Sequence, residues 1–404
     1  MSVFPRPGYL EWLIRQKARQ IIKVVSGVRR CGKSTLFALF QEYLLANGVS
    51  PAQIINISLA SPEYESLPDY KALFCTISEK LLPDKKNYIF LDEIQHVPGC
   101  QKAAASLLLK ENCDLYLAGS NAYFMSGELA TLLTGRCIEL SMMPLSFREF
   151  CDGLNEEHKA SSLQEKFSQY LTAGSFPHVL RYQHGLTEAR QYMRSVYESI
   201  LLNDIVKRYN VADVSMLESV TKFLMQNIGV RTTPAAIASA LTANNRKIDA
   251  KTAERYIRGL TESLMLYKVR RYNIREKAFF TTGHKYYAAD VSMRNTLVRG
   301  QASDIGRVLE NIVYLELRRR GYEVCTGQIG TSGEVDFAAM RDGKTEYYQV
   351  SETTLNEDVL RRELAPLQKI RDNYPKYLLT LDTVFGEADY DGIQKTNVLN
   401  WLLT

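Results

Sequence analysis

Residues 27–34 read Gly-Val-Arg-Arg-Cys-Gly-Lys-Ser and match the pattern Gly-x-x-x-x-Gly-Lys-Ser/Thr at every fixed position. The β-branched, apolar run at residues 21–26 predicts a buried strand before this segment. The apolar spacing after it predicts a helix that ends near Asn47 and Gly48. A strand, a glycine-rich loop and a helix in this order bring backbone N–H groups and a helix N-terminus together, where they attract phosphate. The segment therefore predicts an α/β domain with a parallel sheet and a phosphate-binding loop.

The loop and the start of the following helix supply the groups that a nucleotide and its metal require. Lys33 is expected to reach the β- and γ-phosphates, and the Ser34 hydroxyl is expected to ligate Mg²⁺. The cofactors that we expect are therefore ATP and Mg²⁺. The expected nucleotide-binding residues are Gly27, Val28, Arg29, Arg30, Cys31, Gly32, Lys33, Ser34 and Thr35. The Cys31 thiol, close to Lys33 and to a helix N-terminus, is expected to be reactive, and bound ATP is expected to protect it from alkylation.

A second apolar run, residues 88–91, ends in two acidic residues, Asp92 and Glu93. The run suits a central strand of a parallel sheet, and ligands bind at the carboxyl ends of such strands. Asp92 is therefore expected to hold Mg²⁺ with Ser34. Glu93 is expected to orient and deprotonate the water that attacks the γ-phosphate. Taken alone, the same pattern also describes a strand that simply meets solvent, and it is the combination with the glycine loop that favours catalysis.

Two further polar positions are candidates for contact with the γ-phosphate or the attacking water. Another predicted strand, residues 115–119, is followed by Ser120 and Asn121. Asn121 is the catalytic candidate, Ser120 is its alternative, and a plain turn is the competing interpretation. Arg136, before a fifth predicted strand, is a candidate arginine finger that acts in cis or on a neighbouring copy, which would require an oligomer. An ordinary surface ion pair is the alternative role for this arginine.

Length and composition limit the class of protein. A chain of 404 residues is too long for one ordinary core, so two to four domains are expected. The hydrophobic fraction of 46% and the charged fraction of 24% are typical of a soluble globular protein. The net charge of +5 permits nucleic-acid contact without arguing for it. No apolar run of about eighteen residues and no signal peptide are present, so we expect a cytoplasmic protein without a membrane partner, its seven cysteines reduced.

Several of these motifs together resemble one family. The glycine loop, Leu-Asp-Glu at 91–93, Gly-Ser-Asn at 119–121 and Gly-Arg at 135–136 are similar to the motifs of AAA-type P-loop ATPases. Residues 129–136 and the Pro-Leu-Ser-Phe-Arg-Glu-Phe segment at 144–150 narrow the resemblance to a large family of prokaryotic ATP-binding proteins. That family carries a C-terminal domain of unknown function related to restriction-endonuclease folds. The resemblance implies ATP chemistry, and it leaves the biological role open.

The rest of the chain predicts further modules. The expected organisation is an AAA-type core at 1–150, a helical lid at 151–210, a winged-helix module at 211–290 and a restriction-endonuclease-like α/β domain at 291–404. Gly174 and Pro177 resemble the Gly-x-Pro element that approaches the base in signalling ATPases, with a simple turn as an equal alternative. Basic residues of the winged-helix module that can meet nucleic-acid phosphates are Arg246, Lys247, Arg255 and Arg258. The same module often serves as an intramolecular lid instead.

The C-terminal part contains an incomplete nuclease pattern. Glu310, Asp336 and Gln349 match in kind and order the metal-binding residues of restriction-type nucleases. Ser351 stands where those enzymes have lysine, and Lys344 is too early in the strand pair to replace it. Because serine supplies no charge to the transition state, we expect this domain to be catalytically degenerate and nuclease activity to be absent.

The function that the sequence favours is Mg²⁺-dependent ATP hydrolysis that drives a conformational switch. The winged-helix and C-terminal parts would recognise a macromolecular partner, either DNA or another nucleic acid or a protein. One alternative is an ATP-regulated nucleic-acid-binding protein or metal-dependent nuclease. Another is a signalling protein with slow ATP turnover.

Overall fold

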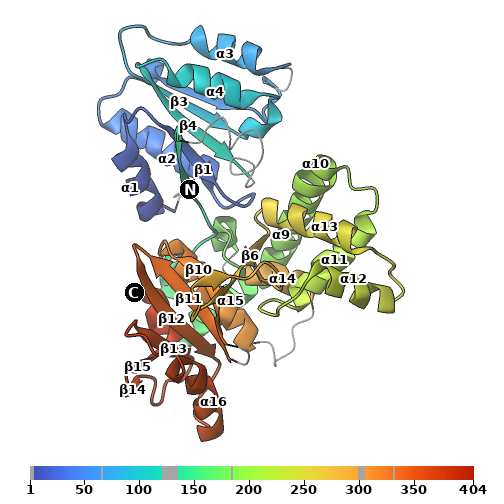
Figure 1. Cartoon of the computed structure of the whole chain (residues 1–404). Helices are drawn as coiled ribbons and strands as arrows, with labels where there is room; N and C mark the ends of the chain where they lie inside the picture. Colours follow the sequence, from blue (N-terminus) through green and yellow to red (C-terminus); the bar gives the residue numbers. More distant parts are fainter. Residues whose placement is uncertain (1–3, 65–66, 121–134, 183–184, 299–304, 331–332) are drawn as a thin grey trace. The chain divides into compact units, whose positions relative to one another are not determined.

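The computed structural model describes residues 4–64, 67–120, 135–182, 185–298, 305–330 and 333–404 (Figure 1). The chain divides into two compact units. The first contains Met1–Pro144 and the short segment Glu262–Leu264, and the second contains Leu145–Thr261 and Met265–Thr404. No described helix is both long enough and apolar enough to cross a membrane.

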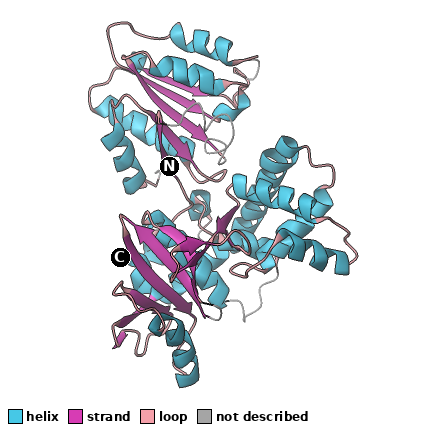
Figure 2. Cartoon of the chain, in the orientation of Figure 1, coloured by secondary structure: helices cyan, strands magenta, loops and turns pink. Residues whose placement is uncertain are grey.

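The first unit is built on a five-stranded sheet in which every neighbouring pair is parallel, with the strand order β2-β3-β4-β1-β5. The strands are β1 (Ile22–Ser26), β2 (Ile54–Ser58), β3 (Asn87–Asp92), β4 (Cys113–Gly119) and β5 (Cys137–Ser141). The helices are α1 (Pro7–Gln16), α2 (Lys33–Ala46), α3 (Tyr70–Ser78) and α4 (Cys100–Leu108), with short 3₁₀ turns η1 (Pro51–Gln53) and η2 (Ile94–His96). Figure 2 shows these helices around the magenta strands of the sheet.

Both faces of β3 are buried, which explains its unbroken apolar run. Phe90 faces α2 and lies 5.3 Å, ring centre to ring centre, from Phe37 of that helix. Ile89 and Leu91 point to the opposite face, where they belong to the core shared with α3 and α4. Parallel sheets covered on both sides read as continuous hydrophobic runs rather than alternating ones. Packing on both faces therefore fixes the position of the strand and of Asp92 at its carboxyl end.

The second unit combines helices with an eight-stranded mixed sheet and a two-stranded sheet. Its helices are α6 (Phe147–Asp152), α7 (Glu156–Lys159), α8 (Leu163–Ala173), α9 (Leu186–Ser199), α10 (Lys207–Tyr209), α11 (Val214–Gln226), α12 (Pro234–Ala243), α13 (Ala250–Glu262), α14 (Val291–Leu297), α15 (Ile305–Arg319), α16 (Glu357–Gln368) and α17 (Val398–Leu403). A 3₁₀ turn, η4 (Pro177–Arg181), follows α8, and a π-helical segment, η5 (Ile200–Val206), joins α9 to α10.

The strands of the larger sheet follow the order β14-β15-β13-β12-β11-β10-β7-β8. They are β7 (Arg271–Asn273), β8 (Ala278–Phe279), β10 (Glu323–Ile329), β11 (Gly333–Arg341), β12 (Lys344–Ser351), β13 (Lys376–Thr380), β14 (Ala388–Tyr390) and β15 (Ile393–Asn397). The remaining strands, β6 (Leu266–Val269) and β9 (Lys285–Ala288), pair with each other in antiparallel fashion.

The strands within residues 211–290, expected to form a winged-helix module, are divided between the two sheets. β6 and β9 form an antiparallel pair, but β7 pairs in parallel with β10 of the larger sheet. The exposed edge of β10 needs a partner for its backbone N–H and C=O groups, and β7 supplies it. Strands from residues before 290 are therefore part of the same sheet as the C-terminal residues.

Candidate functional site

Two positions of the glycine loop favour glycine, Gly32 by its backbone conformation and Gly27 by the lack of space for a Cβ atom. Gly32 has a φ of 109° and stands immediately before α2, in a left-handed conformation that is costly for other residues. A Cβ atom on Gly27 would lie 2.3 Å from the backbone oxygen of Met142 and 2.7 Å from Sγ of Cys31. The N-terminus of α2 has no side-chain cap. Its backbone N–H groups are therefore available to an anion.

Lys33, the first residue of α2, lies inside the curve of this loop. Its side chain is buried, and Nζ donates hydrogen bonds to the backbone oxygens of Gly27 at 2.8 Å and Val28 at 3.3 Å. The ammonium is thus held next to the loop N–H groups. This is the position from which a lysine can bind the β- and γ-phosphates of a nucleotide seated on the loop.

The other side chains of the loop differ in exposure. Arg30 and Thr35 are exposed, Arg29 is half-buried, and Val28 and Cys31 point into the core. Cys31 has no exposed surface. The expectation of a reactive Cys31 thiol is therefore wrong, because the loop turns this side chain away from solvent.

The loop meets the tip of β3 through one side-chain contact. Oγ of Ser34 donates a hydrogen bond to Oδ2 of Asp92, the last residue of β3. Burial raises the pKa of Asp92, and the bond from Ser34 opposes that rise. A hydroxyl and a carboxylate oxygen in direct contact suit Mg²⁺, which takes one or two protein oxygens and completes its shell with phosphate oxygens and water. Within the described residues, no group of three or more His, Cys, Asp or Glu side chains is arranged for a metal ion, so the remaining ligands would come from the nucleotide and water.

Glu93 follows directly and has an unusual backbone. Its φ of 52° and ψ of 42° place a non-glycine residue in the left-handed region, a conformation that costs free energy and is concentrated at functional sites. Its Oε2 accepts hydrogen bonds from Nε2 of Gln95 and, at 3.3 Å, from Oγ of Ser120. Ser120 follows β4, which lies beside β3 as the sequence-based argument required. Asn121 lies outside the described residues.

Arg136 is not brought to this site within one chain. It is exposed, and its backbone oxygen accepts a hydrogen bond from the backbone nitrogen of Ile22, at the start of β1. The glycine loop begins after the other end of that strand. Five residues of strand span roughly 16 Å, at about 3.3 Å per residue. An action in cis is therefore not supported by this geometry, and only an action on a neighbouring copy stays open as a proposal.

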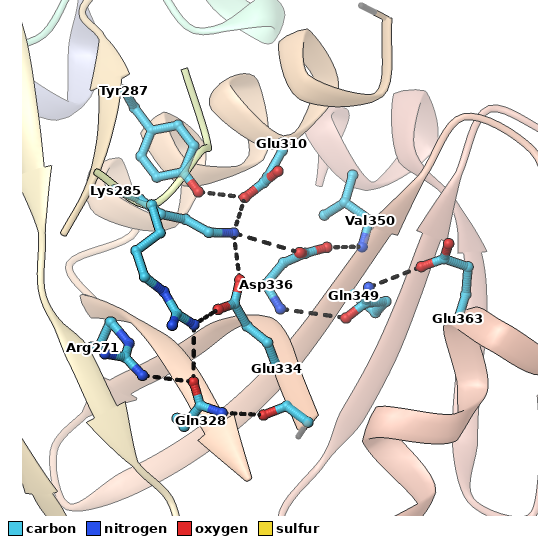
Figure 3. Close-up of polar contacts among 12 residues, drawn as sticks. Arg271, Lys285, Tyr287, Glu310, Gln328, Glu334, Asp336, Gln349, Val350 and Glu363 are labelled. Atoms are coloured by element: carbon cyan, nitrogen blue, oxygen red, sulfur yellow. Dashed lines mark hydrogen bonds and ion pairs between the residues drawn. The ribbon is translucent and has the colours of Figure 1, made fainter. Parts of the chain in front are cut away.

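A second polar cluster, in the second unit, contains the three residues singled out by the nuclease pattern (Figure 3). Glu310 comes from α15, Asp336 from β11 and Gln349 from β12. The backbone nitrogen of Asp336 donates to Oε1 of Gln349 at 3.3 Å, and Oδ2 of Asp336 accepts from the backbone nitrogen of Val350 at 2.9 Å. Ser351 takes no part, since its hydroxyl donates to the backbone oxygen of Thr353 at 3.1 Å.

A lysine does stand among these acids, and the sequence-based argument missed it. Nζ of Lys285, from β9, lies 2.9 Å from Oε1 of Glu310, 3.0 Å from Oε1 of Glu334 and 3.9 Å from Oδ1 of Asp336 (Figure 3). Tyr287 of the same strand donates to Glu310. The sequence contained one indication, because Lys285 begins a run of otherwise apolar or aromatic residues. In the structure all four positions of this strand are buried. A lysine in such a run needs buried acids as partners.

The basic residues expected to meet nucleic acid lie on the surface. Arg255 and Arg258 are exposed on one face of α13, and Arg246 and Lys247 are exposed in the segment before that helix. Arg246 also donates a hydrogen bond to the hydroxyl of Ser215 at 2.9 Å.

Gly174 and the residues after it hold two parts of the second unit together. The backbone nitrogen and Oγ of Ser175 both donate to Oδ2 of Asp290. Gly174 has a φ of 93°, and a Cβ there would lie 2.2 Å from Oγ of Ser292. These contacts give the segment a structural role in the second unit.

The chain is similar to several known proteins. Residues 19–151 match the family model of an AAA domain, and residues 164–304 match that of a domain of unknown function. An uncharacterized protein of Haemophilus influenzae is 36% identical over 403 residues, covering 100% of this chain and 99% of the relative. An uncharacterized protein of Methanocaldococcus jannaschii is 25% identical over 363 residues, covering 86% of this chain and 78% of the relative. A Walker-type ATPase structure from Pyrococcus abyssi shares the fold over 73% of this chain and 96% of its own, with a TM-score of 0.50 and 16% identity.

Proposed function

Because the chain belongs to the same family as the uncharacterized Haemophilus influenzae protein and its residues 19–151 match the model of an AAA domain, we propose that it binds ATP with Mg²⁺ on the loop at residues 27–34 and hydrolyses it. The observation that carries this proposal is the contact between Ser34 and Asp92. These residues are 58 positions apart in the chain. Their contact joins the phosphate loop to the strand end where Glu93 stands, as hydrolysis at the γ-phosphate requires.

Each residue has one task in the proposed reaction. The backbone N–H groups of the loop and the Lys33 ammonium bind the phosphates and offset their charge. Ser34 and Asp92 would hold Mg²⁺, which draws electron density from the phosphate oxygens when it is bound. Glu93 accepts a proton from the attacking water as the new bond to the γ-phosphorus forms, and ADP leaves. Arg136 is proposed to act on the site of a neighbouring copy, and Asn121 to contact the water or the γ-phosphate.

Two substitutions test the proposal. Lys33→Ala is expected to abolish binding of a fluorescent ATP analogue. Glu93→Gln is expected to leave binding intact and to reduce kcat by about 10²–10⁴-fold, since it removes the proton acceptor and keeps the side-chain size. Lys102→Ala is the control, because that exposed lysine lies on α4, outside the site. ATP turnover that survives Glu93→Gln would contradict the role of Glu93.

We also propose that ATP binding and hydrolysis switch the conformation of the second unit, which contains the helical region 151–210, nearly all of the winged-helix part 211–290 and the C-terminal part 291–404 that shares a sheet with it. Such modules can be held by a γ-phosphate and released when it is cleaved. The restriction-endonuclease-like character of the last domain and the cytoplasmic location are parts of the same proposal. The partner would be a nucleic acid or a protein.

The exposed basic residues around α13 favour nucleic acid as one partner. The comparison to make is the ATPase rate with duplex DNA, single-stranded DNA and RNA over a series of salt concentrations. Stimulation that fades as salt rises would indicate phosphate contacts, because bound protein cations displace counterions from the nucleic acid. Arg255→Ala together with Arg258→Ala should then weaken the stimulation. A rate that no nucleic acid changes would leave a protein as the partner.

A further inference from the structure

Gln95 lies beside the proposed catalytic carboxylate and is used by none of the steps above. Its Nε2 donates to Oε2 of Glu93 and lies 3.3 Å from Oγ of Ser120. Ser120 also donates to the same oxygen of Glu93. The three side chains therefore contact one another, and one carboxylate oxygen of Glu93 receives two hydrogen bonds.

The chemistry of this set determines which way the Gln95 amide faces. A carboxylate can only accept hydrogen bonds, so the amide group that faces Glu93 must be the NH₂. The carbonyl oxygen, Oε1, must then face elsewhere. That oxygen is buried, and no described residue donates a hydrogen bond to it. A buried acceptor without a donor is uncommon, and it calls for a donor that arrives with a ligand.

We propose that Gln95 is a positioning residue for ATP hydrolysis, and this inference rests on the proposed function of Glu93. The NH₂ group fixes the Glu93 carboxylate. The carbonyl oxygen accepts the second hydrogen of the water whose first hydrogen Glu93 takes. Both amide atoms are attached to one carbon, so the group that holds Glu93 also carries Oε1, the acceptor without a donor among the described residues. With both hydrogens engaged, a lone pair of the water is free to face the γ-phosphorus.

The backbone supports a fixed rather than a mobile arrangement. Glu93 is held in a left-handed conformation at the start of η2, and its backbone nitrogen donates to Oδ1 of Asp92 at 3.0 Å. Gln95 lies within the same turn. The carboxylate and the amide are therefore separated by one residue of defined geometry, which suits a pair that must act together.

The test compares Gln95→Met and Gln95→Glu with Glu93→Gln and with the double variant Glu93→Gln/Gln95→Met. Gln95→Met keeps the length of the side chain and removes the amide, and Gln95→Glu keeps an acceptor but places a like charge beside Glu93. His96→Ala is the matched control, since His96 is exposed in the same turn. The readouts are the thermal midpoint, the dissociation constant of a fluorescent ATP analogue and kcat.

Both Gln95 variants are expected to bind the analogue with the wild-type affinity and to lose about 10²-fold in kcat, the loss that follows from a misplaced reacting group. The double variant should be no slower than Glu93→Gln, because the water that Gln95 orients has then already lost its proton acceptor. A kcat within about twofold of wild type in Gln95→Met, with Glu93→Gln inactive, would overturn this inference and leave the proposed function intact. Turnover that survives Glu93→Gln would contradict the proposed function itself.

Discussion

Lys285→Met removes the cation from the acidic cluster of the second unit while keeping an unbranched side chain of similar length. In the wild type, the ammonium touches Glu310 and Glu334 and faces Asp336. The side chains of Lys285, Glu310 and Asp336 are 6%, 12% and 15% exposed, so water can do little to replace the lost charge. Breaking a buried ion pair by removing one partner costs about 3–5 kcal/mol. A loss of that size lowers the thermal midpoint by on the order of 10 °C in a domain of this class.

The free energy of unfolding that Lys285→Met loses depends on pH, and the direction of this dependence follows from the pKa of Asp336. Burial and then the nearby Glu310 raise the pKa of Asp336 well above its usual value of 3.8, while Lys285 opposes the rise. A raised carboxyl pKa means that the folded state holds the proton more tightly than the unfolded state. The stability attached to this group is therefore present at acid pH and decreases as pH rises from 3.8 through the raised pKa. Without Lys285 that pKa rises further, so the penalty should be largest at neutral pH and should shrink toward pH 4.

Other charged groups modify the size of the effect. Burial opposes the ionisation of Glu334, but Lys285 and Arg231 outweigh it and lower the pKa of Glu334. Arg231 is 2.7 Å from Glu334 and stays in place in the variant. Glu363, which accepts from Gln349 at 2.9 Å, adds negative charge near Asp336. The variant therefore leaves an excess of negative charge that Arg231 offsets only in part.

The assay is urea unfolding of the full chain at pH 7.5 and at pH 4.5, together with the thermal midpoint at both pH values. Lys344→Met is the control, because it removes an exposed lysine from β12 of the same sheet. We expect Lys285→Met to lose about 3–5 kcal/mol at pH 7.5 and to lose less at pH 4.5. A loss below about 1 kcal/mol at pH 7.5, the size expected for an exposed ion pair, would refute the reasoning.

Two further substitutions or treatments probe local features. Gly174→Ala should destabilise the second unit by about 1–3 kcal/mol, because the new Cβ would lie 2.2 Å from the Ser292 hydroxyl and the backbone has a φ of 93°. Thermal unfolding measures this loss. Gly8→Ala is the comparison, since a Cβ at Gly8 meets nothing within 4 Å. A maleimide at neutral pH should label Cys75, which is exposed, well before Cys31, which is buried, and peptide mass mapping over time would contradict this if Cys31 reacted first.

The parts of the fold around the candidate site that the sequence predicted well are those whose geometry is local. A glycine loop between a buried strand and a helix has few alternative conformations, so the positions of Lys33 and Ser34 follow from the chain itself. To place Asp92 and Glu93 near the loop, one further assumption was needed: the strand before them lies in the same parallel sheet as the strand before the loop. The contact between Ser34 and Asp92 agrees with that step. Gln95 could not be assigned from the sequence, because its importance rests on which atom of its amide faces Glu93.

The failures have a common physical cause. The sequence places a serine at position 351, and the lysine of β12, Lys344, lies at the other end of that strand. Lys285 lies on β9, which belongs to the two-stranded sheet. The strand β7, close to β9 in the chain, pairs with β10 of the larger sheet. Only the pairing between segments far apart in sequence determines which charges meet. Arg136 shows the same limit, since the parallel register of β1 and β5 puts it at the opposite end of β1 from the phosphate loop.

The register of the strands also gives the acids of the second unit and those of the first different partners. At the tip of β3, Asp92 meets a hydroxyl and a backbone N–H, which leave a carboxylate free to take a divalent cation. At β11, Asp336 faces an ammonium of its own chain. A fixed ammonium competes with a metal ion for the same carboxylate oxygens and needs no ligand from solution. Asp92 accepts hydrogen bonds from uncharged groups, which favours the proposed nucleotide-linked metal in the first unit. Asp336 faces a lysine from a distant strand, which favours an internal ion pair in the second unit.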